Sequence, residues 1–273
     1  ASIYDPPLIL YAKGTRVPED EAALAIVGTR HPTAYGMRIA SRFASELAER
    51  GITIVSGLAR GVDGEAHRGA LKVKGRTIAV LGCGLDIIYP KEHASLFEEI
   101  SERGAILSEL PLGTPPEAFH FPKRNRIING LAMGVLVVEA SQKSGSLITA
   151  SLAADEGREV YAIPGAVDSL VSQGTNHLIQ NGARLVTSDE EILEDLAPQI
   201  RASLGTESRT LPRNDGWLNS DDPVLKLLTN EPLSLDEIAI GLDQNPTQIS
   251  SHLTQLELEG AVRRAFGGRY ARI

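Results

Sequence analysis

The chain has 273 residues, of which 42% are hydrophobic, and its 35 acidic against 27 basic side chains give a formal net charge of −8. This length allows one large and one small domain, and the acidic balance argues against bulk electrostatic binding of duplex DNA, although not against a local basic cleft. The single cysteine, Cys83, excludes an intrachain disulfide, and the lack of a long apolar run or signal-peptide pattern predicts a cytoplasmic protein without a membrane span.

Apolar strands alternate with helical patterns along most of the chain. A short N-terminal segment, residues 1–20, leads into a domain predicted over residues 21–197, and a polar stretch rich in turn residues then predicts a linker at 198–220. Strands are expected at 24–27, 52–55, 77–81, 105–107, 135–138, 160–163 and 185–186. Continuous apolar strands joined by helices predict an α/β fold with a mostly parallel sheet, whose ligand-binding loops share one edge.

Residues 221–273 show three helical patterns followed by a hairpin, which predicts a small winged-helix domain. These 53 residues carry 5 Lys and Arg against 8 Asp and Glu, and the helix expected in a DNA groove, 247–259, has no basic side chain. A protein-interaction or regulatory role is therefore favoured over sequence-specific duplex binding, although Arg263, Arg264 and Arg269 on the wing could still contact DNA.

The strongest functional signal is a basic cluster, Lys123, Arg124 and Arg126, which surrounds Asn125. Charge runs are usually solvated faces, but here Phe121 is close enough in sequence to stack on a base while the cations hold phosphates. The cluster therefore predicts contacts to a nucleic-acid backbone.

A Ser-Gly-Ser turn, Ser144, Gly145 and Ser146, follows the strand at 135–138 and opens into a helical pattern. Such a turn leaves backbone N–H groups free at the positive end of a helix dipole, which suits a phosphate or another anion. The alternative is a plain turn with a serine cap.

Two further loops follow predicted strands. Gly28 and Thr29 precede Arg30 where a dinucleotide fingerprint would stand, but the GxGxxG pattern is absent, and Gly36 permits a close approach at the helix start. Arg30 could bind a phosphate through two N–H groups, or it could stabilise the loop by pairing with a carboxylate. The first interpretation is favoured.

In the second loop, Ser56 and Gly57 could present backbone N–H groups to a ligand. Asp63 is expected to cap the next helix. His67 stands four residues later, and a structural histidine is favoured over a metal-binding or acid–base residue.

Motifs of catalysis are absent: no GxSxG, Walker A, CxxC or HExxH pattern occurs, and Glu109 and Glu139 have no evident catalytic partner. No catalytic residue, metal site or cofactor is predicted. The residues favour a binder of a phosphorylated ligand over an enzyme.

The chain resembles the DprA family of DNA-processing proteins, also called Smf, over about residues 4–195. The resemblance is carried by five motifs in the same order, at 28–36, 56–63, 121–128, 144–150 and 160–165. One departure is Thr29, where the family more often has serine, and it keeps the hydroxyl group.

This resemblance implies an extended Rossmann-like domain that binds single-stranded DNA, forms a homodimer and loads the RecA recombinase onto incoming strands during natural transformation. It also implies a pocket lined by Arg30 with further contacts from the basic cluster and a structural role for Asn125. The expected DNA-binding residues are Arg30, Lys123, Arg124, Arg126, Gly28, Thr29, Ser56, Gly57, Phe121, Asn125, Ser144, Gly145 and Ser146.

Two alternatives stay open. One is a nucleotide phosphoribohydrolase of the lysine-decarboxylase-like type, whose Pro-Gly-Gly-x-Gly-Thr-x-x-Glu segment is matched here only by Pro164-Gly165 and a separate Gly174-Thr175 without the glutamate. The other is a winged-helix transcription factor with a ligand-sensing α/β domain.

Overall fold

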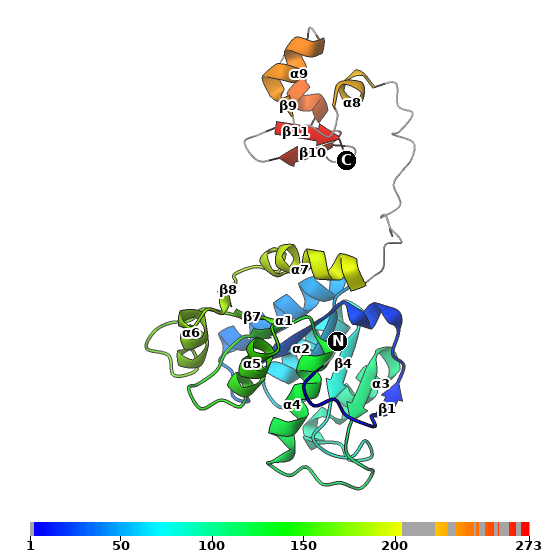
Figure 1. Cartoon of the computed structure of the whole chain (residues 1–273), viewed down its shortest axis with the longest axis vertical. Coiled ribbons are helices and arrows are strands. Elements are labelled where there is room, and N and C mark those ends of the chain that lie inside the picture. The colour runs from blue at the N-terminus through cyan, green and yellow to red at the C-terminus, as the bar shows by residue number, and fades with distance from the viewer. Residues whose placement is uncertain are drawn as a thin grey trace. The chain divides into compact units, whose positions relative to one another are not determined.

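The chain forms two compact units, Ala1–Glu207 and Ser208–Ile273 (Figure 1). The computed structural model describes residues 3–203, 222–228, 233–242, 244–245, 249–253, 256, 262–265 and 269–272. Within this part of the chain, no helix is both long and apolar enough to cross a membrane.

The first unit is built on an eight-stranded sheet with the order β1-β5-β4-β3-β2-β6-β7-β8. Its strands are β1 Tyr11–Gly14, β2 Ala23–Val27, β3 Thr53–Ser56, β4 Thr77–Val80, β5 Ala105–Ser108, β6 Gly134–Val137, β7 Glu159–Ala162 and β8 Arg184–Leu185. Strands β2 to β8 pair in parallel, and β1 pairs antiparallel to β5. The predicted α/β fold with a mostly parallel sheet is therefore confirmed.

Helices cover both faces of this sheet (Figure 1). They are α1 Ala34–Glu49, α2 Val62–Lys72, α3 Ala94–Arg103, α4 His120–Leu131, α5 Ser146–Asp155, α6 Gln173–Gln180 and α7 Asp189–Ser203, with 3₁₀ turns η1 Pro18–Glu21 and η2 Lys91–His93. Side chains alternate along β2: Leu24 and Ile26 pack in the cluster formed with α1, α2 and α7, whereas Ala25 and Val27 pack with α4 and α5. This double burial explains the uninterrupted apolar strands.

Three elements differ from the prediction. The basic cluster, for which no secondary structure was predicted, lies on helix α4; Pro122 is tolerated there because it falls in the first turn, where its missing N–H is not needed. Helix α7 continues through Pro198 to Ser203, into the predicted linker, whose remaining residues lie outside the described part of the chain. The predicted N-terminal segment supplies β1, which covers the edge of β5.

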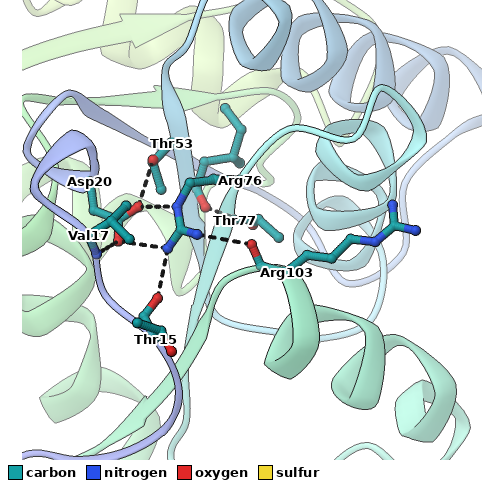
Figure 2. A network of polar contacts seen from close by, with 8 residues as sticks. Thr15, Val17, Asp20, Thr53, Arg76, Thr77 and Arg103 are labelled. Atoms are coloured by element: carbon teal, nitrogen blue, oxygen red, sulfur yellow. Dashed lines mark hydrogen bonds and ion pairs between the residues drawn. The ribbon is translucent and has the colours of Figure 1, made fainter.

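A buried carboxylate, Asp20, fastens η1 to the amino-terminal edge of the sheet (Figure 2). Arg76 donates to both oxygens of Asp20 at 2.8 and 2.9 Å, and Thr53 Oγ1 donates at 2.9 Å. The same guanidinium donates to the carbonyl groups of Thr15 and Arg103. Burial by itself would raise the pKa of Asp20, but the hydrogen bonds and positive charge of Arg76 outweigh it and hold the pKa below its usual value of 3.8.

We expect Asp20→Asn to lower the free energy of unfolding by at least about 2 kcal/mol near neutral pH, because the half-buried guanidinium of Arg76 loses its buried charged partner. Since the pKa of Asp20 is lower in the folded state, the wild type loses this contribution as the pH falls below the unfolded-state value of about 3.9. Urea unfolding of both proteins at about pH 7 and about pH 3 measures the difference. An equal difference in unfolding free energy between the two proteins at both pH values would contradict a stabilising ionised Asp20.

The second unit contains the predicted winged-helix elements. They are α8 Pro223–Leu227, β9 Leu233–Ser234, α9 Leu235–Leu242, β10 Val262–Ala265 and β11 Arg269–Arg272. The predicted hairpin is confirmed, since β10 pairs antiparallel with β11, and β9 adds a third strand. The predicted third helix lies partly outside the described residues; within it, His252 Nε2 lies 2.8 Å from Asp222 Oδ2.

Candidate functional site

A narrow cleft opens where β2, β3 and β4 end, beside the first turn of α4. We call it the Arg30 cleft; its lining residues are Arg30, Gly57, Ala59, Arg60, Leu81, Gly82, Cys83, Tyr89, Pro90 and Phe121. Because these strands are parallel, their following loops converge on one edge of the sheet, where α/β folds bind ligands. Its volume of about 20 Å³ is room for a water-sized group, so the lining side chains must move before a base can enter.

A cation lies on an aromatic ring in the wall of this cleft, and a second such pair lies on α4. The exposed guanidinium of Arg30 lies 5.2 Å from the centroid of the Phe121 ring, and Phe121 in turn lies 5.8 Å from Tyr89. In the second pair, Lys123 Nζ lies 5.6 Å from the centroid of the Phe119 ring, and Phe119 is 55% exposed. Each pair places a positive charge beside a ring on which a base can stack.

Arg124 points in the opposite direction from Lys123. It is buried, and its guanidinium donates to the carbonyl oxygens of Gly57 at 2.9 Å and of Val80, and to Asn125 Oδ1 at 3.2 Å. These contacts join α4 to the ends of β3 and β4. Arg124 therefore braces the floor of the Arg30 cleft, and its donors are turned toward the protein.

Gly57 lies against this buried arginine. A Cβ at residue 57 would overlap Arg124 Nη2 and stand 2.6 Å from Asp63 Oδ2, so only glycine fits without displacing them. Its N–H donates to Asp63 Oδ2 at 3.2 Å. The prediction that Asp63 caps its own helix is wrong on this point, because α2 begins after Gly61 without a side-chain cap and the carboxylate turns back to the loop.

Burial is the main cause of the pKa shifts of the ionisable side chains beneath the cleft. Burial raises the pKa of Asp63, although the positive charge of Arg124 and the N–H of Gly57 act against it. Burial lowers the pKa of Arg124 to about 10, which leaves it protonated at neutral pH. His67 is buried with its Nδ1 2.6 Å from Thr77 Oγ1, and burial lowers its pKa to about 3. His67 is therefore neutral, as suits the structural role that the sequence favours.

Arg126 is held by two carboxylates. Its Nε donates to Asp5 Oδ2 at 2.8 Å, and its Nη2 donates to Glu109 Oε1 at 2.6 Å. The side chain is only 15% exposed. Arg126 thus ties the N-terminal segment and the end of β5 to α4, and a phosphate would have to displace these partners to reach it.

The backbone groups predicted to meet a phosphate are largely occupied within the protein. Thr29 N–H donates to Glu139 O at 2.6 Å, and the buried Ser56 hydroxyl donates to Ile26 O at 2.6 Å. In the turn after β6, the N–H groups of Ser144 and Ser146 donate to Ser141 O and Ser144 Oγ. These residues shape the loops, and Asn125 Nδ2 links the turn to α4 through Gly145 O at 3.5 Å.

Most of the cleft wall was not predicted from the sequence, and the unpredicted residues include Arg60 and Tyr89. Arg60 is exposed and forms an ion pair with Glu92, the second residue of η2. The motif 56–63 contains Arg60, but its position at the mouth depends on the loop after β4, which the sequence pattern does not place.

A metal site is not apparent in the described part of the chain, where no group of three or more His, Cys, Asp or Glu side chains could hold an ion. Cys83, the lone cysteine, is buried in the cleft wall, and burial raises the pKa of its thiol to about 11.

Two protein-family profiles match this chain. That of DNA recombination-mediator protein A matches residues 1–197, and that of the DprA winged helix domain matches residues 217–268. The Smf protein of Escherichia coli is 43% identical over 278 residues, which cover 98% of this chain and 72% of that protein.

Solved structures give the same result. The DNA processing protein A of Streptococcus pneumoniae superposes with a TM-score of 0.68 at 46% identity, over 71% of this chain and 68% of that one. The Helicobacter pylori protein, whose structure was determined for its single-stranded DNA binding mode, gives a TM-score of 0.66 at 35% identity, over 72% of this chain and 90% of that one.

Proposed function

The chain belongs to the DNA recombination-mediator protein A family, and we propose that it is a non-enzymatic protein that binds single-stranded DNA at the Arg30 cleft. The observation that carries the proposal is the pair of exposed cations on aromatic rings, Arg30 on Phe121 and Lys123 on Phe119. Phosphates and bases can be bound together on such a surface without recognition of particular bases. The similarity to a Helicobacter pylori protein with a single-stranded DNA binding mode supports the same ligand.

In this proposal the predicted residues divide into two groups. Arg30 contacts a phosphate from the wall of the cleft and Lys123 contacts one from the surface of α4, because both side chains are exposed. Arg124 acts from beneath by fixing Gly57 and the ends of two strands. Phe121 supplies a ring on which a base can stack after Arg30 moves to a phosphate. Base preference should be slight, since every base has a stacking face.

Hydrogen–deuterium exchange with a poly-thymidine oligonucleotide tests the location of the site. We expect slower exchange in the loops at 57–60 and 82–90 and in the first turns of α4, where the strand would cover the cleft. Protection confined to residues 221–273 would instead favour the winged helix as the DNA-binding unit.

Glu92 is expected to weaken DNA binding, because its carboxylate pairs with Arg60 at the cleft wall and competes with phosphate. Glu92→Gln should therefore tighten single-strand binding by about two- to fivefold, as an exposed pair would allow. Fluorescence anisotropy at low salt measures the change, and Glu98→Gln, which leaves the exposed partner Lys13 on β1, is the matched control. Weaker binding by Glu92→Gln would show that the ion pair builds the site.

The finer proposal is that the bound strand is delivered to the RecA recombinase during natural transformation, and the family's description as a recombination mediator supports it. Strand-exchange assays on DNA coated with single-strand binding protein test the recombinase partner. Release of free base from a nucleoside monophosphate would instead favour a phosphoribohydrolase.

We also propose a homodimer, with exposed apolar residues late in the first unit, such as Val167 and Leu170, as the expected contact.

A further inference from the structure

A buried carboxylate fills the position at which a Rossmann-like sheet usually receives a ligand phosphate. Strands β2 and β6 lie side by side, and the chain leaves β2 toward β3 on one side but leaves β6 toward β7 on the other side. Ligands of open α/β sheets bind at such a crossover point, with a phosphate at the start of the helix that follows the first strand. In this protein, that helix is α1, and Glu139 follows β6 directly beside it.

Glu139 makes the contacts that a phosphate would make there. Its side chain accepts the N–H of Thr33, the N-cap residue of α1, at 2.9 Å and the Thr33 hydroxyl at 2.6 Å. Glu139 is 3% exposed, and a Cβ added to Gly36 in the first turn would overlap its Oε2. The close approach that Gly36 was predicted to allow is therefore made to this carboxylate.

The remaining side of the crossover point is closed by the backbone of the same residue. Glu139 O accepts the N–H of Thr29 at 2.6 Å, and a Cβ at Gly28 would stand 2.9 Å from that oxygen. Glu139 thus holds both ends of the loop from Thr29 to Thr33, which carries Arg30. A negative group at this place is also stabilised by the dipole of the sixteen-residue helix α1.

We propose that Glu139 is the residue that closes this fold to nucleotides: its carboxylate takes the place of a ligand phosphate at the start of α1. The N–H and hydroxyl groups of Thr33 and the N–H of Thr29 are satisfied by Glu139. Small phosphorylated ligands are excluded from the crossover point, and recognition is left to the Arg30 cleft. The proposal concerns the crossover point alone and does not depend on single-strand binding.

Glu139→Ala should open an anion site, and thermal unfolding in inorganic phosphate against sodium chloride of equal ionic strength tests this. Phosphate stabilises folded proteins generally relative to chloride, so the wild type sets the reference. We expect phosphate to raise the Tm of Glu139→Ala by about 2–4 °C more than it raises the Tm of the wild type, as ligand linkage predicts for a domain of this size. Glu139→Gln is the matched control, because its amide fills the same space, and phosphate should raise its Tm no more than that of the wild type. An equal rise in Tm for Glu139→Ala and the wild type would overturn the proposal.

A second measurement keeps the proposal testable if Glu139→Ala does not fold. In the wild type, titration of inorganic phosphate and then adenosine monophosphate should leave the amide resonances of Thr33 and Gly36 unshifted, because Glu139 already occupies the site. Saturating shifts at both amides would overturn the proposal. Shifts confined to the Arg30 cleft would agree with it and would report phosphate binding at the proposed DNA site.

Discussion

Arg124→Met is expected to cost about 3–5 kcal/mol of stability, which is the range seen when one partner of a buried charged pair is removed. The destabilisation has two causes. The carbonyl groups of Gly57 and Val80 would lose their common donor, and Asp63 would remain buried without the cation that opposes its desolvation. Thermal unfolding followed by circular dichroism should show a Tm lower by roughly 10 °C.

Lys123→Met, the neighbouring substitution on α4, is the matched control for this experiment. It removes the same charge from an exposed position, so the stability should change by no more than about 0.5 kcal/mol. Single-strand affinity should fall in Lys123→Met, because the ammonium group that binds a phosphate is removed. A Tm for Arg124→Met within about 1 °C of the wild type would contradict the role of Arg124 as a brace.

Arg30→Ala is expected to weaken single-strand binding at least about tenfold, because it removes both a phosphate ligand and the cation stacked on Phe121. The slope of log affinity against log salt should become shallower by about 0.7 for each phosphate that the protein no longer neutralises. Arg30→Lys should be intermediate, since it keeps the charge but loses the planar fork. Anisotropy titrations at several salt concentrations measure both quantities.

Arg103→Ala is the control for Arg30→Ala. Arg103 is an exposed arginine at the end of α3, directly before β5, and so lies at the opposite edge of the sheet from the cleft. The two variants change the net charge equally, but Arg103→Ala should bind within about twofold of the wild type. Equally weakened binding in both variants would mean that affinity follows overall charge and not the Arg30 cleft.

The sheet and the position of Arg30 could be predicted because they depend on local pattern. Continuous apolar strands required burial on both faces, and Arg30 closely follows such a strand, so it had to lie at the carboxyl edge. All three cations of the basic cluster were predicted to hold phosphates, but Arg124 is buried and the Arg126 side chain is only 15% exposed. Helical spacing contained the missing signal: Arg124 precedes Ile127 and Ile128 by three and four residues, and therefore shares their buried face.

The partners of the buried charges could not be predicted in the same way. Glu139 is 106 residues from Thr33, and Asp5 is 121 residues from Arg126. Each contact forms only because the sheet order brings distant loops to one edge. The same limit applies to Arg60, whose partner Glu92 lies beyond the next strand.

The central claim, a preference for single-stranded DNA, is tested most directly by fluorescence anisotropy of the wild-type protein with a labelled single strand and with its duplex, at low and moderate salt. We expect tighter binding to the single strand at both salt concentrations, because the exposed rings need unpaired bases on which to stack, and an affinity that falls as salt rises, because the cations bind phosphates. Equal or stronger binding to the duplex would contradict the claim and would direct attention to the winged helix.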